Sequence, residues 1–118
     1  MANIVVIDDD PDIRDMVKAT LESAGHKVAV AADGREGIQQ CRAFQADLVI
    51  TDLFMPEHEG LEAIKELRIQ SPELRIVAIS GRPTGGTMLE VAKRLGADAA
   101  LPKPFLADEL LRIVEQTL

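Results

Sequence analysis

The chain of 118 residues is long enough for one domain with its own core, and 47% of its residues are hydrophobic. Its net charge of −7 repels nucleic-acid phosphates and leaves no basic amphipathic face for anionic lipid. We therefore expect neither nucleic acid nor a membrane as a partner of this domain. The single cysteine, Cys41, excludes an internal disulfide and fits a small buried residue in a cytoplasmic protein. The first residues match neither a signal peptide nor a membrane span, and we expect one domain over residues 1–118.

Five short apolar runs predict the strands of a sheet. Each run is continuous rather than alternating, which is typical of parallel strands buried on both faces. The runs lie near residues 3–7, 27–31, 47–51, 75–79 and 98–101.

Helical patterns separate these runs. In the first, Asp10 is placed to cap the helix, Pro11 suits its first position, and Gly25 can end it. Its apolar residues recur at helical spacing from Ile13 to Ala24. The second pattern follows Asp33 and Gly34 and ends near Phe44, and the third runs from Leu61 to just before Ser71 and Pro72. The fourth runs from Met88 to Gly96, and the last runs from Leu106 to Thr117.

The alternation of strands and helices predicts an α/β fold. Right-handed crossovers make it a doubly wound, flavodoxin-like parallel sheet of five strands in the order 2-1-3-4-5. In such a sheet, ligands bind outside the carboxyl ends of the strands, where the first and third strands are neighbours. Asp8, Asp9 and Asp52 stand at the ends of those two strands. Motif and topology therefore point to the same place.

These carboxylates predict a site for a hard cation. Two carboxylates about 4 Å apart repel each other by roughly 4 kcal/mol at an effective dielectric near 20, and a cation relieves this repulsion. Oxygen ligands select Mg²⁺, Mn²⁺ or Ca²⁺ over zinc, and a few protein ligands completed by water favour Mg²⁺, with Mn²⁺ as a possible substitute. Lys103 follows the last strand, and together with Mg²⁺ it would neutralise the three carboxylates.

A neutralised site of this kind can accept a phosphoryl group. An aspartate can act as the nucleophile and form an acyl phosphate, and an ionised carboxylate needs no separate base. The cation and Lys103 would stabilise charge on the transferring oxygens. The hydroxyl of Ser80, at the end of the fourth strand, could donate a hydrogen bond to one of those oxygens.

Four pieces of the sequence, in this order and at this spacing, resemble the receiver domain of two-component response regulators, over essentially the whole chain. The likeness is to single-domain receivers of the chemotaxis-regulator type. The pieces are Val6-Ile7-Asp8-Asp9, Thr51-Asp52-Leu53-Phe54-Met55-Pro56 with Gly60, Ala78-Ile79-Ser80-Gly81, and Gly96-Ala97-Asp98 followed by Lys103-Pro104-Phe105.

The resemblance implies a metal site and a phosphoacceptor. Asp52 would be the phosphoacceptor. Asp9, the carboxylate of Asp52 and the backbone carbonyl of Phe54 would bind Mg²⁺ directly, and Asp8 would hold a metal-bound water.

The resemblance also implies a signalling role. Ser80 would be the switch hydroxyl, and Lys103 would pair with the phosphoryl group, aimed by a cis bond to Pro104. The donor would be a histidine kinase or a histidine phosphotransfer protein, and an unknown downstream protein would read the state. The domain would catalyse only its own phosphorylation and dephosphorylation, so it is not expected to be an enzyme in the ordinary sense.

The sequence departs from the family pattern at Ala100, where receivers commonly carry Tyr or Phe three residues before the lysine. An aromatic readout is therefore impossible there, and we expect signalling through movement of the loop over residues 81–87, which contains three glycines. Phe54 and Arg82 flank the site, and we expect the first to shield the acyl phosphate and the second to steer a partner.

Other residues beside these motifs carry weaker expectations. The fourth helix, last strand and last helix form the usual output face of receivers, and leucines off their core stripes suggest a partner or a homodimer there. Those leucines are Leu89, Leu111 and Leu118. Pro56 and Gly60 are expected to shape a loop, and His26 and His58 to be solvated.

Three other functions fit parts of the sequence. A haloacid-dehalogenase-like phosphatase also uses a strand-end aspartate, but Asp12 stands where that family has Thr or Val after its Asp-x-Asp. A flavin or nucleotide binder on the same fold lacks a Trp or Tyr for stacking. The chain could also be the receiver fragment of a larger DNA-binding regulator.

Overall fold

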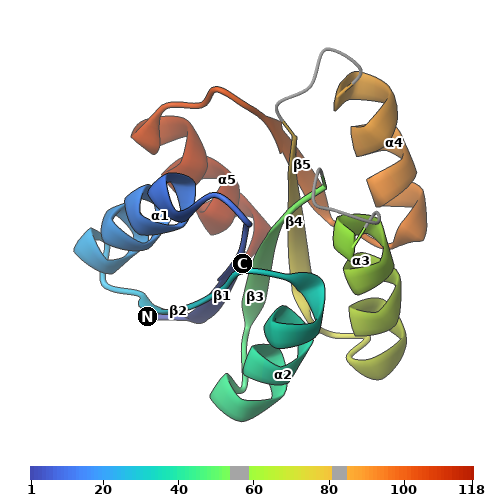
Figure 1. Cartoon of the computed structure of the whole chain (residues 1–118). Helices are drawn as coiled ribbons and strands as arrows, with labels where there is room; N and C mark the ends of the chain where they lie inside the picture. Colours follow the sequence, from blue (N-terminus) through green and yellow to red (C-terminus); the bar gives the residue numbers. More distant parts are fainter. Residues whose placement is uncertain (54–58, 81–84) are drawn as a thin grey trace.

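The computed structural model describes residues 1–53, 59–80 and 85–118. Within these ranges, five parallel strands form one sheet in the order β2-β1-β3-β4-β5, which confirms the predicted order (Figure 1). The strands are β1 (Asn3–Ile7), β2 (Lys27–Ala31), β3 (Leu48–Asp52), β4 (Arg75–Ser80) and β5 (Ala99–Pro102).

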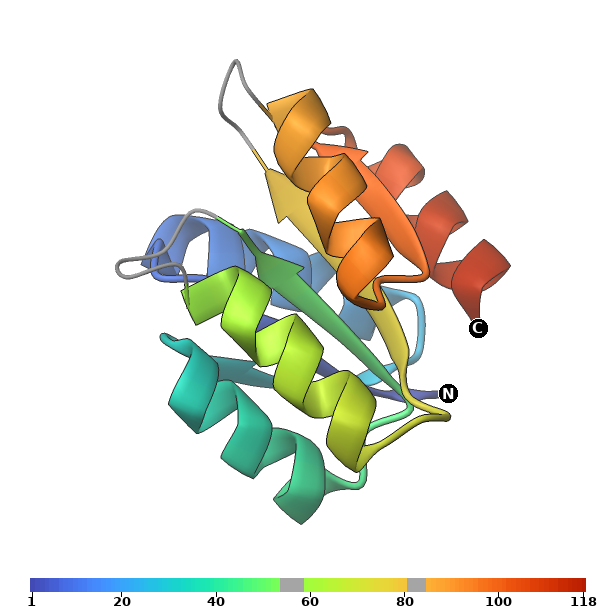
Figure 2. The same cartoon turned by 90° about the vertical axis from the view of Figure 1, so that its right-hand side faces the viewer.

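Helices cover both faces of this sheet. α1 and α5 pack on one face, and α2, α3 and α4 pack on the other (Figure 2). In the described part of the chain the helices are α1 (Pro11–Ser23), α2 (Gly34–Phe44), α3 (Glu59–Gln70), α4 (Gly85–Leu95) and α5 (Ala107–Thr117). This is the predicted doubly wound, flavodoxin-like architecture.

The buried strands divide their side chains between two cores. In β1, Val5 and Ile7 belong to the core beneath α2, α3 and α4, whereas Ile4 and Val6 belong to the core beneath α1 and α5. All four are fully buried, and each contributes about 1.5–3 kcal/mol of hydrophobic stabilisation. Cys41 of α2 lies in the first core, as expected, and burial raises the pKa of its thiol to about 12.

The predicted ends of α1 are confirmed. The side chain of Asp10 accepts a hydrogen bond from the backbone N–H of Asp12, Pro11 is the first helical residue, and Gly25 follows the helix with a φ of +94°. Leu106 was expected on the apolar stripe of the last helix, and this is wrong. It is the extended residue before α5 and is 70% exposed.

The predicted loop over 81–87 is wrong at its C-terminal end. α4 begins at Gly85, so residues 85–87 belong to its first turn rather than to the loop. Apolar periodicity missed this start because glycine has low helix propensity. Residues 81–84, including Arg82, lie outside the described ranges.

Arg68 connects α3 to the turn between α4 and β5, at the edge of the sheet away from the strands' carboxyl ends. Its guanidinium donates to the carbonyls of Pro72, Leu74 and Gly96 at 2.7–3.1 Å and to Oδ2 of Asp98 at 2.9 Å. Gly96 has a φ of +131°, and a Cβ there would lie 2.9 Å from Cγ of Arg68. This contact therefore requires the glycine.

Two further predictions concern histidines and leucines expected at the surface. His26 is more than a solvated residue, because its Nδ1 accepts a hydrogen bond from the backbone N–H of Ala2 at 3.1 Å. Leu118 is exposed, whereas Leu111 is half-buried against the α1–α5 core, and the side chain of Leu89 lies outside the described residues, as does His58. Among the described helices, none has the length and apolar character to cross a bilayer.

Candidate functional site

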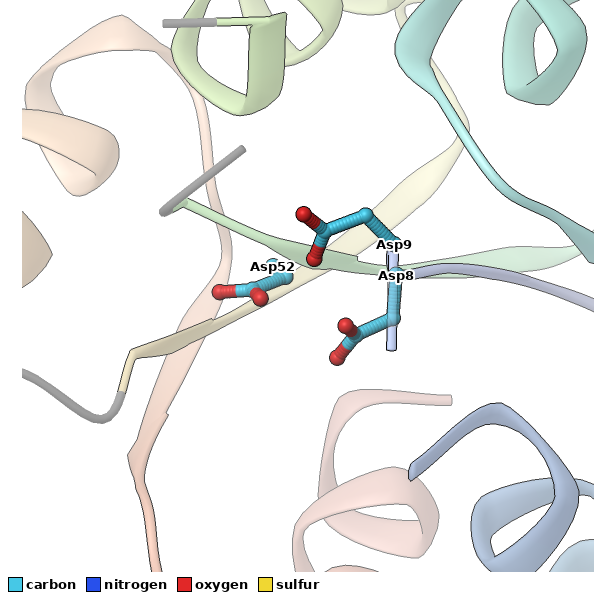
Figure 3. Close-up of side chains that lie close together, drawn as sticks. All are labelled: Asp8, Asp9 and Asp52. Atoms are coloured by element: carbon cyan, nitrogen blue, oxygen red, sulfur yellow. The ribbon is translucent and has the colours of Figure 1, made fainter. Parts of the chain in front are cut away.

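Three carboxylates meet at the carboxyl ends of two neighbouring strands (Figure 3). Asp8 and Asp9 follow β1, Asp52 is the last residue of β3, and these strands pair in parallel register. One carboxylate oxygen from each of the three residues lies within 4.8 Å of the others. The structure thus brings together the three acids predicted from the sequence.

Asp8 is fully buried and is held at each of its polar groups. Its backbone N–H donates to the carbonyl of Ala31 at 3.1 Å, and its Oδ1 accepts from the backbone N–H of Asp10 at 2.9 Å. Its Oδ2 accepts from Lys103 at 3.0 Å, and its backbone carbonyl accepts from Nη1 of Arg14 at 2.7 Å. These four hydrogen bonds fix the orientation of the carboxylate.

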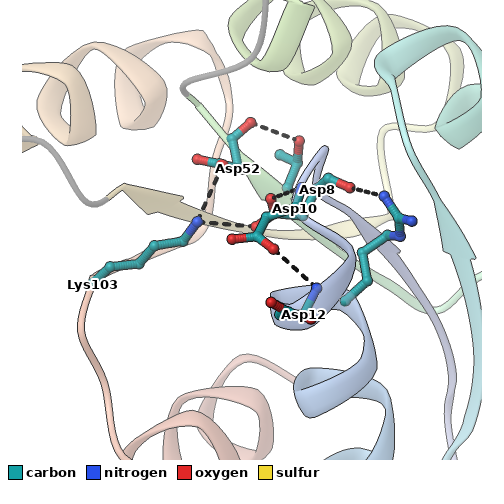
Figure 4. A network of polar contacts seen from close by, with 7 residues as sticks. Asp8, Asp10, Asp12, Asp52 and Lys103 are labelled. Carbon is teal, nitrogen blue, oxygen red and sulfur yellow. Dashed lines mark hydrogen bonds and ion pairs between the residues drawn. The ribbon is translucent and has the colours of Figure 1, made fainter.

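Lys103 reaches the same group from the opposite end of the chain (Figure 4). Its Nζ lies 3.0 Å from Oδ2 of Asp8 and 3.2 Å from Oδ2 of Asp52. Its backbone N–H donates to the carbonyl of Ser80 at 2.7 Å, and its bond to Pro104 is cis, as predicted. β4 and the start of the β5–α5 connection therefore fix the lysine at this edge.

The electrostatics of the pair reflect its burial. Desolvation raises the pKa of Asp8, helped by the charge of Asp52 and opposed by the hydrogen bonds from Asp10 and Lys103. Desolvation alone would lower the pKa of Lys103, but its contacts with Asp8 and Asp52 outweigh it and raise that pKa. Lys103 is therefore cationic at neutral pH, while the acidic cluster favours additional positive charge.

Asp52 lies in a tight backbone environment. The residue is only 4% exposed, and Leu53 after it donates to the carbonyl of Ile79 at 3.0 Å. Gly60 is the second residue of α3, not part of a loop as predicted, and a Cβ there would overlap the backbone carbonyl of Asp52. Gly60 therefore lets the first turn of α3 pack directly against Asp52.

Ser80 ends β4 at the same edge and is 1% exposed. Its Oγ has no hydrogen-bond partner among the described residues. A buried hydroxyl without a partner loses free energy relative to water, by about 1–3 kcal/mol. This orphaned donor suits a ligand oxygen that arrives at the site.

The donor set fits a hard divalent cation. All three side chains offer carboxylate oxygens, and Asp9 is exposed while Asp8 and Asp52 are buried, so a cation could keep water on its outer side. Few protein ligands and retained water are typical of Mg²⁺. The carbonyl of Phe54, the fourth predicted ligand, lies outside the described residues, as does the rest of Phe54.

Sequence reasoning missed two contacts in this site. Arg14 lies in the first turn and a half of α1, and nothing in the spacing of the sequence directs its guanidinium to the carbonyl of Asp8. The approach of Gly60 to Asp52 depends on how α3 packs on β3. The position of a glycine eight residues after a strand-end aspartate was the only sequence indication of this approach, and the same spacing also suits an ordinary loop.

Known proteins share the sequence and the fold. The response regulator receiver domain family matches residues 4–115. The chain is 38% identical over 117 residues to the DNA-binding transcriptional regulator NtrC of Azospirillum brasilense, covering 99% of this chain and 24% of that protein. It is 35% identical over 113 residues to the response regulator MprA of Mycolicibacterium vanbaalenii, covering 92% of this chain and 46% of that protein.

Solved structures give the same result. The chemotaxis response regulator CheY4 of Vibrio cholerae superposes with a TM-score of 0.91 and 34% identity, covering 100% of this chain and 99% of CheY4. The receiver domain of NtrX from Brucella abortus gives 0.91 and 35%, covering 98% and 97%. The chain spans about a quarter to a half of the two curated relatives' lengths. It belongs to the response regulator receiver domain family of two-component systems.

Proposed function

We propose that Asp52 accepts a phosphoryl group from a phosphohistidine donor. The observation that carries this proposal is the position of Lys103, whose Nζ contacts the carboxylates of both Asp8 and Asp52 beside the unpartnered hydroxyl of Ser80. A nucleophile, a fixed cation and a free donor at one edge suit the charge distribution of phosphoryl transfer. The family match favours this function over a small phosphatase.

The proposed transfer forms one bond to phosphorus and breaks another. A carboxylate oxygen of Asp52 attacks phosphorus, and the new O–P bond forms as the P–N bond to the donor histidine breaks. The imidazole nitrogen keeps the electron pair of that bond and takes a proton from solvent. Lys103 then pairs with an oxygen of the phosphoryl group, and Ser80 donates to another.

Asp8, Asp9 and Asp52 would hold Mg²⁺, together with the carbonyl of Phe54. When bound, the ion supplies positive charge next to the transferring oxygens. The buried carboxylate of Asp8 supports this assignment because it is held in place with an oxygen within 4.8 Å of carboxylate oxygens of Asp9 and Asp52.

The donor would be a histidine kinase or a histidine phosphotransfer protein that docks beside Lys103. An apolar groove with a volume of about 370 Å³ opens there between α1 and the β5–α5 connection. Met16 on its wall is exposed, and Lys103 lines both the groove and the site. A helix that carries phosphohistidine could therefore rest on this groove while its imidazole reaches Asp52. The lining residues are Ile13, Met16, Lys103, Pro104 and Phe105.

The face formed by α4, β5 and α5 would bind a downstream protein or a second copy of the chain and so transmit the signal. A second groove of about 390 Å³ lies on this face, beside the small residues Ala99 and Ala100. Because Ala100 offers no aromatic ring, the signal would depend on α4 and its preceding loop. A cytoplasmic location fits this role.

Labelling with acetyl phosphate tests the proposal. Wild type should gain one phosphoryl group in the presence of Mg²⁺ and none with excess EDTA, as measured by intact-protein mass spectrometry. Asp52→Asn should gain none. Asp15→Asn, an exposed aspartate of α1, is the matched control and should label as wild type does. Unchanged labelling of Asp52→Asn, or steady turnover of p-nitrophenyl phosphate, would contradict the proposal.

A further inference from the structure

Arg14 lies in α1, close to the acidic site but outside its ligand set. Its Nη1 donates to the backbone carbonyl of Asp8 at 2.7 Å, and its own N–H donates to the carbonyl of Asp10 at 3.1 Å. The guanidinium is half-buried. Arg14 therefore contacts the turn that connects β1 to α1, which carries two of the three carboxylates.

The carbonyl of Asp8 has lost its partner in the sheet. The N–H of Asp8 donates to the carbonyl of Ala31, so in this parallel register the N–H of Asp33 would be the matching donor to the carbonyl of Asp8, but β2 ends at Ala31. Asp8 is fully buried, and a buried carbonyl without a donor is costly. Arg14 replaces the missing strand donor with a short, charge-assisted hydrogen bond.

We propose that Arg14 is a positioning residue for the cation site: by holding the carbonyl of Asp8, it fixes the turn that presents Asp8 and Asp9 to Mg²⁺. This inference rests on the proposed function. With Arg14 in place, every polar group of Asp8 is fixed, and the carboxylate points towards Asp52 and Lys103. Without it, the Asp8–Asp9 peptide loses the hydrogen bond at its carbonyl, and its rotation is resisted through the N–H and carboxylate of Asp8 instead. Groups that orient metal ligands from behind typically affect metal affinity about 10- to 100-fold when they are removed.

Because Arg14 is positively charged, the direction in which its removal changes Mg²⁺ affinity separates positioning from electrostatic repulsion. If the residue acted only through its charge, Arg14→Ala would remove a cation from beside three carboxylates, and Mg²⁺ would bind more tightly. If it positions the turn, the same substitution weakens Mg²⁺ binding although the protein becomes more negative. The two effects therefore change the Mg²⁺ dissociation constant in opposite directions.

The experiment measures Mg²⁺ binding by calorimetry to wild type, Arg14→Ala, Arg14→Lys and Arg35→Ala. Arg35 is an exposed arginine of α2, so its removal changes the net charge equally without touching the turn. We expect the dissociation constant to rise about 10-fold in Arg14→Ala, to recover most of the way in Arg14→Lys, and to stay the same or fall in Arg35→Ala. Equal or tighter binding by Arg14→Ala would overturn the proposal.

A second readout separates positioning from a general loss of stability. The amide of Asp10, which donates to Oδ1 of Asp8, should exchange its hydrogen faster in Arg14→Ala, while amides in the middle of β4 should not. In Arg14→Ala, the Mg²⁺ concentration that gives half-maximal labelling by acetyl phosphate should rise. The labelling rate at saturating Mg²⁺ should fall by a smaller factor. If Arg14→Ala does not fold, Arg14→Gln takes its place in each comparison. A wild type that binds no Mg²⁺ would instead overturn the proposed function itself.

Discussion

Lys103 and Asp8 are 95 positions apart in the sequence, yet Nζ of Lys103 lies 3.0 Å from Oδ2 of Asp8. The same Nζ lies 3.2 Å from Oδ2 of Asp52, so one ammonium serves two buried carboxylates. Removing one partner from a buried charge group leaves the others uncompensated. The site is thus held together by a charge balance that Mg²⁺ and a phosphoryl group can alter.

Lys103→Met should destabilise the metal-free protein by about 2–3 kcal/mol at pH 7.5, because Asp8 and Asp52 lose their counter-charge. Mg²⁺ should then stabilise the variant more than wild type, since the cation meets a more negative site. Thermal unfolding with EDTA and with Mg²⁺ measures both effects. Lys103→Arg is the control that keeps the charge. An equal Mg²⁺-induced shift in Tm for wild type and Lys103→Met would show that the lysine and the cation do not share these carboxylates.

Gly60→Ala should impair the site through the backbone. The added methyl group would overlap the carbonyl of Asp52 and lie 2.7 Å from Cα of Leu53, so the first turn of α3 must move away. We expect a loss of about 1–3 kcal/mol in stability and a slower labelling of Asp52 by acetyl phosphate. Glu62→Ala, at an exposed position of the same helix, should leave both unchanged. Normal labelling of Gly60→Ala would mean that Asp52 tolerates the displacement of α3.

Gly96→Ala and Gly25→Ala form a matched pair at the ends of α4 and α1. Both glycines have positive φ values, +131° and +94°, so alanine strains the backbone at each, by about 1 kcal/mol or more. Nothing lies within 4 Å of the new methyl group at Gly25, whereas at Gly96 it meets Arg68. Urea denaturation should therefore show a larger loss for Gly96→Ala. Equal losses would indicate that Arg68 moves aside freely despite its hydrogen bonds.

The stability of the protein should fall at alkaline pH because of Cys41. Burial raises the pKa of its thiol from 9.0 to about 12, so the folded state keeps a proton that the unfolded state releases. The contribution is complete below pH 9 and is lost as the pH rises from about 9 towards 12. At pH 10 the loss is about 1.4 kcal/mol relative to Cys41→Ala. The chain has no tyrosine to titrate in this range. Parallel pH profiles of wild type and Cys41→Ala between pH 8 and 10 would contradict this expectation.

The sheet order and the meeting of Asp8, Asp52 and Lys103 were predictable from the sequence for one physical reason. Continuous apolar runs such as Ile4–Ile7 mark parallel strands buried on both faces, and the carboxyl ends of such strands share one edge of the sheet. Whatever follows those runs must therefore lie together.

The remaining features depend on packing that a one-dimensional pattern does not encode. The guanidinium of Arg14 could have pointed to solvent, and the carbonyl of Asp8 is available to it because β2 ends at Ala31. Leu106 fits a helical stripe, but its extended backbone places it before α5. Local periodicity does not report where a helix begins when its first turn contains glycines, as at Gly85.

Borohydride reduction tests most directly whether Asp52 carries the phosphoryl group. Borohydride converts an aspartyl phosphate to homoserine, and peptide mass mapping then locates the converted residue. After treatment with acetyl phosphate, we predict homoserine at position 52, dependent on Mg²⁺ and absent from the Asp52→Asn protein. Homoserine at position 8 or 9 in wild type, or a phosphoryl label that resists reduction because it sits on a hydroxyl, would contradict the assignment of Asp52 as the phosphoacceptor.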